Sequence, residues 1–320
     1  MRKSQLHLAS IALCLAFTIG ILTAQAQSQD ARSRRHGYDM LVKGIEQENK
    51  DDNEGALKTY ALVHRNDSVY EDVLVRRISI MMQTEKVAEA LPLCEEGIVI
   101  AGEHLMLFHL SKGACLSELK RYDEAMTTYD RAIALYPGSF RLRYLRALCL
   151  KEKGDHAAAF KAMQDNAVRF PLQRDAHVAL ANYALNEGRL SQAALPALMS
   201  LVMRWGDKRG EELLIYADKL LDNKFDRASV GLDVGEGDVF AEVDLLLENK
   251  VAMNKNYKCE PDLNYPLVRQ GHLLLHALKD MPASDGFYSS YYLPFFKKLV
   301  ASGRFEGFMY HCISNSRDEK

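Results

Sequence analysis

Two histidines four residues apart come nearest to a metal site in this sequence. His272 and His276 lie in the segment Gly-His-Leu-Leu-Leu-His-Ala, so a helix would turn both rings toward one face, where they could hold an ion. A helical metalloprotease motif would also need a glutamate directly after the first histidine, and a leucine stands there instead. The surrounding leucines favour ordinary half-buried histidines, and we predict no metal site.

The other residues that could carry chemistry also favour structural roles. The acidic stretch 233–238 lacks the alternating oxygen ligands and terminal glutamate of a calcium loop, so we expect Asp238 to cap a helix. His109 falls on a helix that must pack, and Cys312 beside His311 has no third partner for nucleophilic catalysis. The sequence contains no P-loop, no dinucleotide glycine fingerprint and no nucleophile elbow. We therefore predict no catalytic residue, no cofactor and no enzyme.

Composition and charge are those of an ordinary globular chain. Of 320 residues, 48% are hydrophobic and 26% are charged, and the formal net charge is -2. A chain so nearly neutral has no electrostatic footprint for nucleic acid. Apart from Cys14 near the N-terminus, the cysteines are Cys94, Cys115, Cys149, Cys259 and Cys312. Five scattered cysteines make no disulfide framework, and we expect small buried hydrophobic side chains, although the set leaves room for one bridge.

The first 26 residues follow the order of a secretory signal peptide. Positive charge at Arg2 and Lys3 precedes an apolar run from Leu6 to Leu22, and the pattern Ala-Gln-Ala follows over residues 24–26. We expect cleavage after residue 26 and export to the periplasm of a bacterium, or otherwise secretion. An uncleaved membrane anchor is the alternative, since the run is marginally long enough to span a bilayer. No later segment is apolar over that length, so we expect no transmembrane helix after cleavage.

A period near 34 residues runs through much of the chain. An alanine recurs at that spacing, and a small residue stands twelve positions before four of the five alanines. The alanines are Ala56, Ala90, Ala125, Ala159 and Ala193, and the earlier small residues are Gly44, Gly113, Ala147 and Ala181, with Ile78 as the exception. Antiparallel helices approach closely only where side chains are small, so the pattern predicts helix hairpins that cross at these residues.

The clearest unit, residues 105–137, resembles a tetratricopeptide repeat. It carries small, aromatic and proline residues where that family places them, at Gly113, Tyr122, Ala125, Tyr129, Ala132 and Pro137. The next unit ends at Pro171 and matches except at Asn166, where a small residue is usual. We expect Pro196 to interrupt the second helix of the unit after that, and the two units before residue 105 are degenerate. The resemblance covers residues 35 to 205.

The resemblance implies an all-α fold, a tetratricopeptide-type right-handed α-solenoid of about five helix pairs followed by a small helical C-terminal region. We expect the repeats and one capping helix, Glu211 to Leu221, to fill residues 35–225. A glycine-rich linker over 226–238 and a helical region over 239–320 then complete the chain.

Three segments of the C-terminal region show helical apolar spacing: Val239 to Glu248, Asn264 to Leu278 and Tyr288 to Val300. A last short helix is expected after Gly303. Aromatic residues crowd the stretch 286–310, and we expect them to form the core of a small bundle that folds back on the repeats. An exposed aromatic docking patch is the alternative.

In the tetratricopeptide-repeat family, the first helix of each pair faces the ligand. On that basis we expect a partner polypeptide in the groove of the array, with Tyr144 as its anchor. The candidate contacts are Leu107, Leu110, Arg141, Tyr144, Leu148, Lys151, Asn182 and Leu185. Arg141 and Lys151 would attract an acidic or carboxylate-bearing segment. A register error of one residue would instead make these residues structural.

The sequence therefore predicts an exported, non-catalytic scaffold whose partner is a protein or peptide. Two alternatives stay open. One is a permanent structural subunit of a cell-envelope complex, and the other is a metal-binding or enzymatic C-terminal region.

Overall fold

A computed structural model describes residues 35–203, 208–282 and 284–313. These residues form two compact units that divide between Tyr136 and Pro137, and each unit is described by itself. The expected signal peptide, residues 1–26, lies outside the described residues. Within the described ranges, every regular element is helical, and no helix combines the length and the apolar character needed to cross a bilayer.

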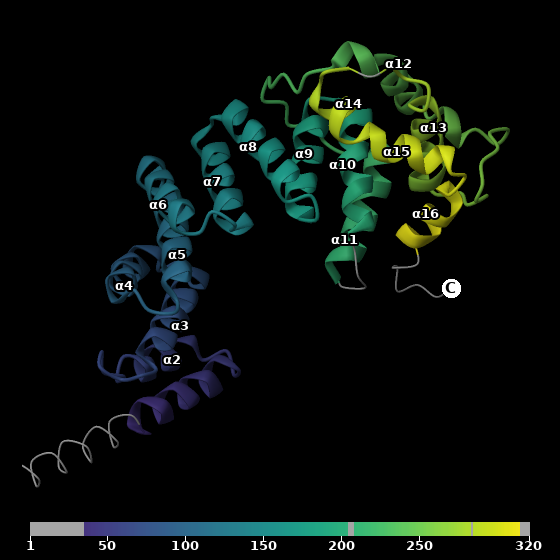
Figure 1. The fold of residues 1–320 in the computed structure, drawn as a ribbon. Helices are drawn as coiled ribbons and strands as arrows, with labels where there is room; N and C mark the ends of the chain where they lie inside the picture. The colour runs from purple at the N-terminus through teal and green to yellow at the C-terminus, as the bar shows by residue number, and fades with distance from the viewer. Residues whose placement is uncertain (1–34, 204–207, 283, 314–320) are drawn as a thin grey trace, which may run out of the picture. The chain divides into compact units, whose positions relative to one another are not determined.

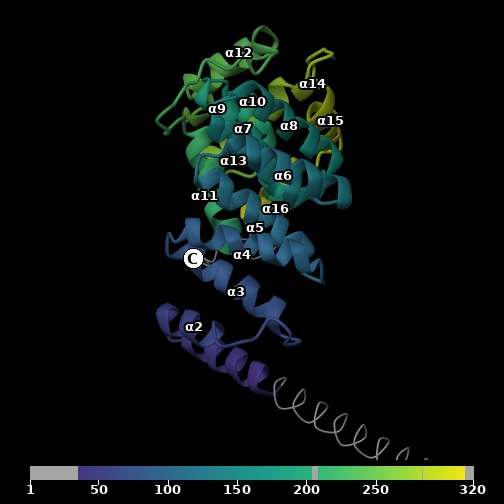
Figure 2. The same cartoon turned by 90° about the vertical axis from the view of Figure 1, so that its left-hand side faces the viewer.

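The first unit is a series of helix hairpins (Figures 1 and 2). A helix described from residue 35 ends at Glu48 and pairs with α2 (Asn53–Tyr60), as a hydrogen bond of 2.6 Å from Thr59 Oγ1 to Gln47 Oε1 shows. The next hairpins are α3 (Tyr70–Gln83) with α4 (Val87–Ile100), and α5 (Leu105–Glu118) with α6 (Tyr122–Leu135). Successive hairpins also touch each other, through α2 with α3 and through α4 with α5.

The second unit continues the pattern with two hairpins and a capping helix. The hairpins are α7 (Phe140–Lys153) with α8 (His156–Arg169) and α9 (Arg174–Asn186) with α10 (Leu190–Val202). The capping helix is α11 (Lys208–Leu221), which packs on α10. With the three hairpins of the first unit, this makes the five expected pairs. The prediction of an all-α array of tetratricopeptide-type helix pairs is confirmed.

Shorter helices complete the second unit (Figure 1). They are α12 (Gly237–Glu248), the 3₁₀ turn η1 (Val251–Met253), α13 (Pro266–Ala277), α14 (Phe287–Tyr291), α15 (Leu293–Ala301) and α16 (Phe305–Ile313). The expected linker region has no helix before Gly237. Helices α12 and α16 contact α10, and α13 contacts α11, so the C-terminal region folds back on the last repeat. The predicted domain boundaries themselves stay predictions.

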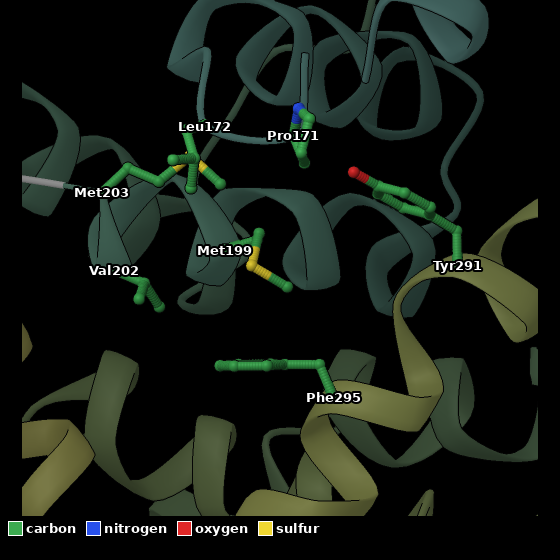
Figure 3. A pocket seen from close by; sticks show the side chains of 7 residues that line it. All are labelled: Pro171, Leu172, Met199, Val202, Met203, Tyr291 and Phe295. Atoms are coloured by element: carbon green, nitrogen blue, oxygen red, sulfur yellow. The ribbon is translucent and has the colours of Figure 1, made fainter. Parts of the chain in front are cut away.

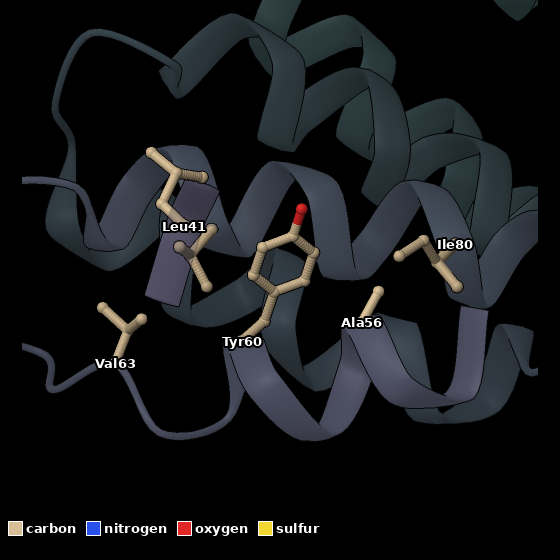
Figure 4. Packing of buried hydrophobic residues seen from close by; sticks show 6 residues of the cluster. Leu41, Ala56, Tyr60, Val63 and Ile80 are labelled. Atoms are coloured by element: carbon tan, nitrogen blue, oxygen red, sulfur yellow. The ribbon is translucent and has the colours of Figure 1, made fainter. Parts of the chain in front are cut away.

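The repeat alanines lie where helices cross. All five are 0% exposed, and the glycines of the same pattern face large rings. A Cβ atom added to Gly44 would lie 2.1 Å from Cε1 of Tyr60, and one added to Gly113 would lie 2.4 Å from Cε1 of Tyr129. Figure 4 shows Tyr60 among the buried side chains of the first hairpin. The glycines are therefore required by close approach of an aromatic ring.

The exception in the pattern, Ile78, has a matching exception sixteen residues later. In two hairpins a glycine is followed at that distance by a tyrosine, whereas Ile78 is followed by Cys94. Both Ile78 and Cys94 are buried, with exposures of 1% and 0%. A large residue on the first helix and a small one on the second fill the crossing as well as the reverse arrangement. The second hairpin is thus a size-swapped version of its neighbours.

Helix α10 runs through Pro196 without interruption, so the expected break there was wrong. Eleven of its thirteen residues are buried, because it packs against α9, α11, α12 and α16. Proline removes one hydrogen bond of the helix, but contacts on several sides outweigh that local loss.

Two expectations for the C-terminal region were also wrong in detail. The segment Tyr288 to Val300 forms two helices, α14 and α15, because Pro294 has no backbone N–H for a continuous helix and instead lies in the first turn of α15. Asp238 does not cap α12, which begins one residue earlier, at Gly237, and has no side-chain cap. The neighbouring Glu236 carboxylate points away from α12 and accepts hydrogen bonds from Tyr288 N (2.8 Å) and Ser289 N (3.2 Å) at the start of α14.

Carboxylates from one helix cap the start of another at two further places in the second unit. Asp244 of α12 accepts from Ser191 N at 2.6 Å, at the start of α10. Asp218 of α11 accepts from Leu267 N at 2.9 Å, at the start of α13. Each pair satisfies an N–H group that a helix leaves unbonded in its first turn. These long-range caps fix how the C-terminal helices dock on the last repeat.

The C-terminal aromatic residues are mostly core, as expected. Tyr288, Tyr292 and Phe296 have exposures of 0%, 0% and 1%. Tyr292 also reaches the repeats, where its hydroxyl lies 2.7 Å from Nδ1 of the buried His177. The hydroxyl of Tyr291 donates to the Ala167 carbonyl at 2.7 Å. The aromatic bundle is thus tied by hydrogen bonds to α8 and α9.

Candidate partner-binding surface

The basic helix α7 is the centre of the candidate surface. It carries five Lys and Arg residues and one glutamate. The Ser139 side chain accepts a hydrogen bond from Leu142 N at its start, and Gly154 ends it with a φ of 92° that favours glycine. Lys151 and Lys153 lie in the last turn, where a cation interacts favourably with the helix dipole. The two caps and the favourable dipole interaction therefore stabilise a helix that carries a high positive charge.

Helix α7 buries one side and leaves the predicted side open. Its buried residues are Leu142, Ala147, Cys149 and Leu150. Of the predicted contacts, Arg141 and Lys151 are exposed, and Tyr144 and Leu148 are half-buried. All four are accessible from solvent on the unburied side.

The Tyr144 ring is held in place by other aromatic rings. It stacks on Phe140 with ring centroids 5.4 Å apart, and Phe140 meets Phe170 edge to face at 5.7 Å. Burial raises the pKa of the Tyr144 hydroxyl, the nearby Asp175 carboxylate raises it further, and Arg209 lowers it. The phenol is therefore neutral and able to donate a hydrogen bond. The charges that act on it lie on α9, at Asp175, and on α11, at Arg209.

A hydrogen bond joins α9 and α11 on this side of the unit. The hydroxyl of Tyr216 on α11 donates to Asn182 Oδ1 on α9 at 2.8 Å, and its ring packs edge to face against Phe225. We call the resulting surface the α7–α9–α11 face. It is defined by Arg141, Tyr144, Leu148, Lys151, Asp175, Asn182, Arg209 and Tyr216.

Two of the predicted contacts, Leu110 and Leu185, are buried in the structure. Leu185 on α9 is 4% exposed, because α10 and the C-terminal aromatic residues cover α9 and bury seven of its thirteen residues. Leu110 on α5 is also 4% exposed, between α4 and α6 in the first unit. Leu107 is half-buried. Leu110 and Leu185 are core residues in this structure, while the role of the remaining six stays a prediction.

Two residues of the α7–α9–α11 face were not predicted from the sequence, although the 34-residue period of the repeats reaches both. Arg209 follows Asp175 by 34 residues, and Tyr216 follows Asn182 by the same distance. Extending the repeat past residue 205 would have placed both on the face. The aromatic support from Phe140 and Phe170 had no such signal, because these residues lie at the ends of two different helices.

An apolar hollow of about 660 Å³ lies elsewhere on the second unit (Figure 3). Its lining residues come from the α8–α9 turn, from α10 and from α14 and α15, and are Pro171, Leu172, Met199, Val202, Met203, Tyr291 and Phe295. Leu172 is 78% exposed and Phe295 is 39% exposed. Part of the aromatic stretch is therefore open, as the alternative reading of that stretch allowed.

His272 and His276 form a stacked pair, with ring centroids 3.9 Å apart, and both rings meet Phe305 edge to face. Nδ1 of His276 donates to the His272 carbonyl at 2.9 Å, and Nδ1 of His272 lies 2.7 Å from the Tyr257 hydroxyl. Burial, together with His276, lowers the pKa of His272 to about 4, so its ring is neutral near pH 7. Within the described ranges, no third His, Cys, Asp or Glu joins them to make a metal-binding group.

Comparison with known proteins gives a family for the repeats. Residues 116–167 match the family model of the tetratricopeptide repeat. No curated protein matches the chain. Among solved structures, MamA (41-end) from Desulfovibrio magneticus RS-1 is 15% identical, covering 60% of this chain and 98% of that one, with a TM-score of 0.43. A MamA RS-1 double mutant is 17% identical, covering 52% and 94%, with a TM-score of 0.44.

The family assignment rests on the sequence match and on the helix hairpins. The matched segment spans the end of α5, all of α6 and α7 and most of α8, and hairpins with the same buried alanines precede and follow it. Residues 116–167 are thus tetratricopeptide repeats, and the helix hairpins on either side of them share the same helix-pair fold.

Proposed function

We propose that this protein is a non-catalytic scaffold that binds a partner polypeptide on the α7–α9–α11 face. The observation that carries the proposal is the setting of Tyr144, which is held by an aromatic stack on an otherwise open, cationic helix side. A rigid, half-buried tyrosine loses little conformational freedom on binding. Residues of this kind dominate the binding energy of protein interfaces.

The charge of the face favours an acidic segment of the partner. The chain as a whole is nearly neutral, whereas α7 alone carries five cations and one acid. Arg209 adds a further cation and Asp175 one carboxylate whose charges act on Tyr144. Carboxylates on the partner would gain from this local field, and association would weaken as salt screens it.

We also propose that the protein is exported, to the periplasm in a bacterium. The support is the charged start, apolar run and Ala-Gln-Ala pattern of the first 26 residues. N-terminal sequencing of the protein recovered outside the cytoplasm is expected to begin at Gln27. A chain that retains Met1 or fractionates with integral membranes would overturn this proposal.

Partner capture from the native source, with crosslinking, tests the binding face. Tyr144→Ala is expected to reduce capture at least tenfold, which corresponds to about 1.4 kcal/mol of binding free energy, and Arg141→Glu is expected to slow association. The matched controls are Tyr310→Ala, at a tyrosine 50% exposed on α16, and Lys161→Glu, at a lysine whose side chain is 70% exposed on α8. Circular dichroism on every variant separates lost contact from lost folding. Capture by both face variants at the wild-type level would refute the proposal.

A permanent structural subunit is the second candidate, and the apolar hollow with its exposed Leu172 favours it. An obligate subunit that leaves such a surface uncovered would self-associate when purified alone. A monodisperse purified protein would count against this candidate. Metal analysis of the same sample tests the remaining alternative, a metal-binding C-terminal region.

A further inference from the structure

Two buried cysteines of the first unit lie against each other across neighbouring hairpins. Cys94 is on α4, the second helix of one hairpin, and Cys115 is on α5, the first helix of the next. Helices α4 and α5 pack directly together, and both cysteines are free and 0% exposed. Their thiols form a hydrogen bond with each other. The two thiols are thus within hydrogen-bonding reach of each other across α4 and α5.

We propose that Cys94 and Cys115 form a disulfide bond that joins α4 to α5 when the chain folds in the presence of a disulfide oxidant such as oxidised glutathione. The bond would link the second hairpin to the third. It would close a loop of about 20 residues, which includes the turn between α4 and α5. Neither the partner-binding face nor the proposed export enters this inference.

The oxidation can begin at either cysteine, because the two thiols are apart when oxidant reaches them. The thiolate of one cysteine attacks one sulfur of oxidised glutathione, forming a mixed disulfide and releasing one glutathione thiolate, which takes up a proton. The other cysteine then loses its proton to solvent and attacks the protein sulfur of the mixed disulfide, and the second glutathione leaves as a thiolate that takes up a proton. Two protein thiols are oxidised, and one glutathione disulfide is reduced to two glutathione thiols.

Burial determines when this reaction takes place. Neither sulfur is accessible in the folded chain, so a glutathione molecule reaches Cys94 or Cys115 only before α4 and α5 have packed or when they open transiently. We expect fast bond formation during folding and slow oxidation of the folded, reduced protein.

The test is refolding of the purified protein from denaturant in a mixture of reduced and oxidised glutathione. The sample is then quenched in acid, alkylated and digested without reductant, and the peptides are analysed by mass spectrometry. We expect a linked peptide pair containing Cys94 and Cys115, with every other cysteine alkylated. The midpoint of thermal unfolding is expected to fall by about 5 °C or more when reductant is added.

Two variants give the controls. Cys94→Ala is expected to lose the reductant dependence of the midpoint, and Cys115→Ala serves the same purpose if Cys94→Ala does not fold. Cys149→Ala, at a cysteine 1% exposed on α7, is expected to keep it. A correctly refolded wild-type protein with every cysteine alkylated, or a linked pair containing any other cysteine, would overturn the proposal.

Discussion

Substitution of Gly113 by alanine is predicted to destabilise the protein because of a single aromatic ring. The added Cβ would lie 2.4 Å from both Cε1 and Cζ of Tyr129, far inside van der Waals contact. Tyr129 is 1% exposed, so its ring cannot move away without displacing other core residues. Such overpacking costs about 1–3 kcal/mol, while alanine gains about 1 kcal/mol over glycine in a helix. We expect a net loss of up to about 2 kcal/mol.

The chain supplies both a control and a rescue for this substitution. Gly307 is helical and exposed and has no atom within 4 Å of an added Cβ, so Gly307→Ala is expected to be neutral or stabilising. One hairpin later, Ala147 and Met163 occupy the positions equivalent to Gly113 and Tyr129. The double variant Gly113→Ala/Tyr129→Met is therefore expected to be at least about 1 kcal/mol more stable than the sum of the two single changes predicts.

Urea unfolding followed by circular dichroism measures all four variants against the wild type. A Gly113→Ala variant with an unchanged midpoint, or single and double variants whose effects simply add, would refute the reasoning from ring contact.

Three further outcomes are expected. Ala159→Leu, at a residue 0% exposed, should cost about 1–3 kcal/mol in urea unfolding, whereas Ala157→Leu on the exposed side of the same helix should cost little; equal melting curves would show that the repeat register is wrong. Glu236→Ala leaves the N–H of Tyr288 unpaired, so hydrogen exchange in α14 should accelerate, and unchanged exchange would contradict the capping role. Burial lowers the pKa of His177 below that of an unfolded histidine, so the unfolded state binds the proton first and stability falls as pH drops below about 6.5. His177→Gln should lose less stability than the wild type between pH 7 and 5, and an identical slope would contradict this.

The repeats could be predicted from sequence because their packing is local and recurs. A hairpin brings together residues about twelve to sixteen apart, and the same small and large residues return with each period, as Ala125 and Tyr129 show. Even the degenerate second hairpin pairs one large with one small residue at its crossing, with Ile78 on the first helix and Cys94 on the second. The helix that caps the stack followed from its apolar spacing.

The docking of the C-terminal region could not be predicted in the same way. Its decisive contacts join residues such as His177 and Tyr292, or Asp244 and Ser191, which are far apart in the chain and occur once. No periodic pattern marks a long-range helix cap. Asp238 was consequently expected to cap α12, since a local cap is the default expectation for an acidic residue before an apolar run.

Helical spacing alone could place only part of the candidate face, because contacts from distant segments decide which residues stay exposed. Helical spacing placed Arg141, Tyr144, Leu148 and Lys151 on one side of α7, and the structure leaves that side open. The same spacing fails for Leu185, because neighbouring elements cover α9 from directions that its own sequence does not encode.

Site-specific photo-crosslinking tests the binding face most directly. A photoreactive residue replaces Lys151 or Asn182, both exposed on the α7–α9–α11 face, and in parallel Lys161 or Val168, both exposed on α8. A further probe replaces Leu172 in the apolar hollow. We predict that a partner polypeptide is crosslinked from Lys151 and Asn182 and not from the two α8 positions. Crosslinking from Leu172 or from α8, with none from the face, would contradict the proposed mode of binding.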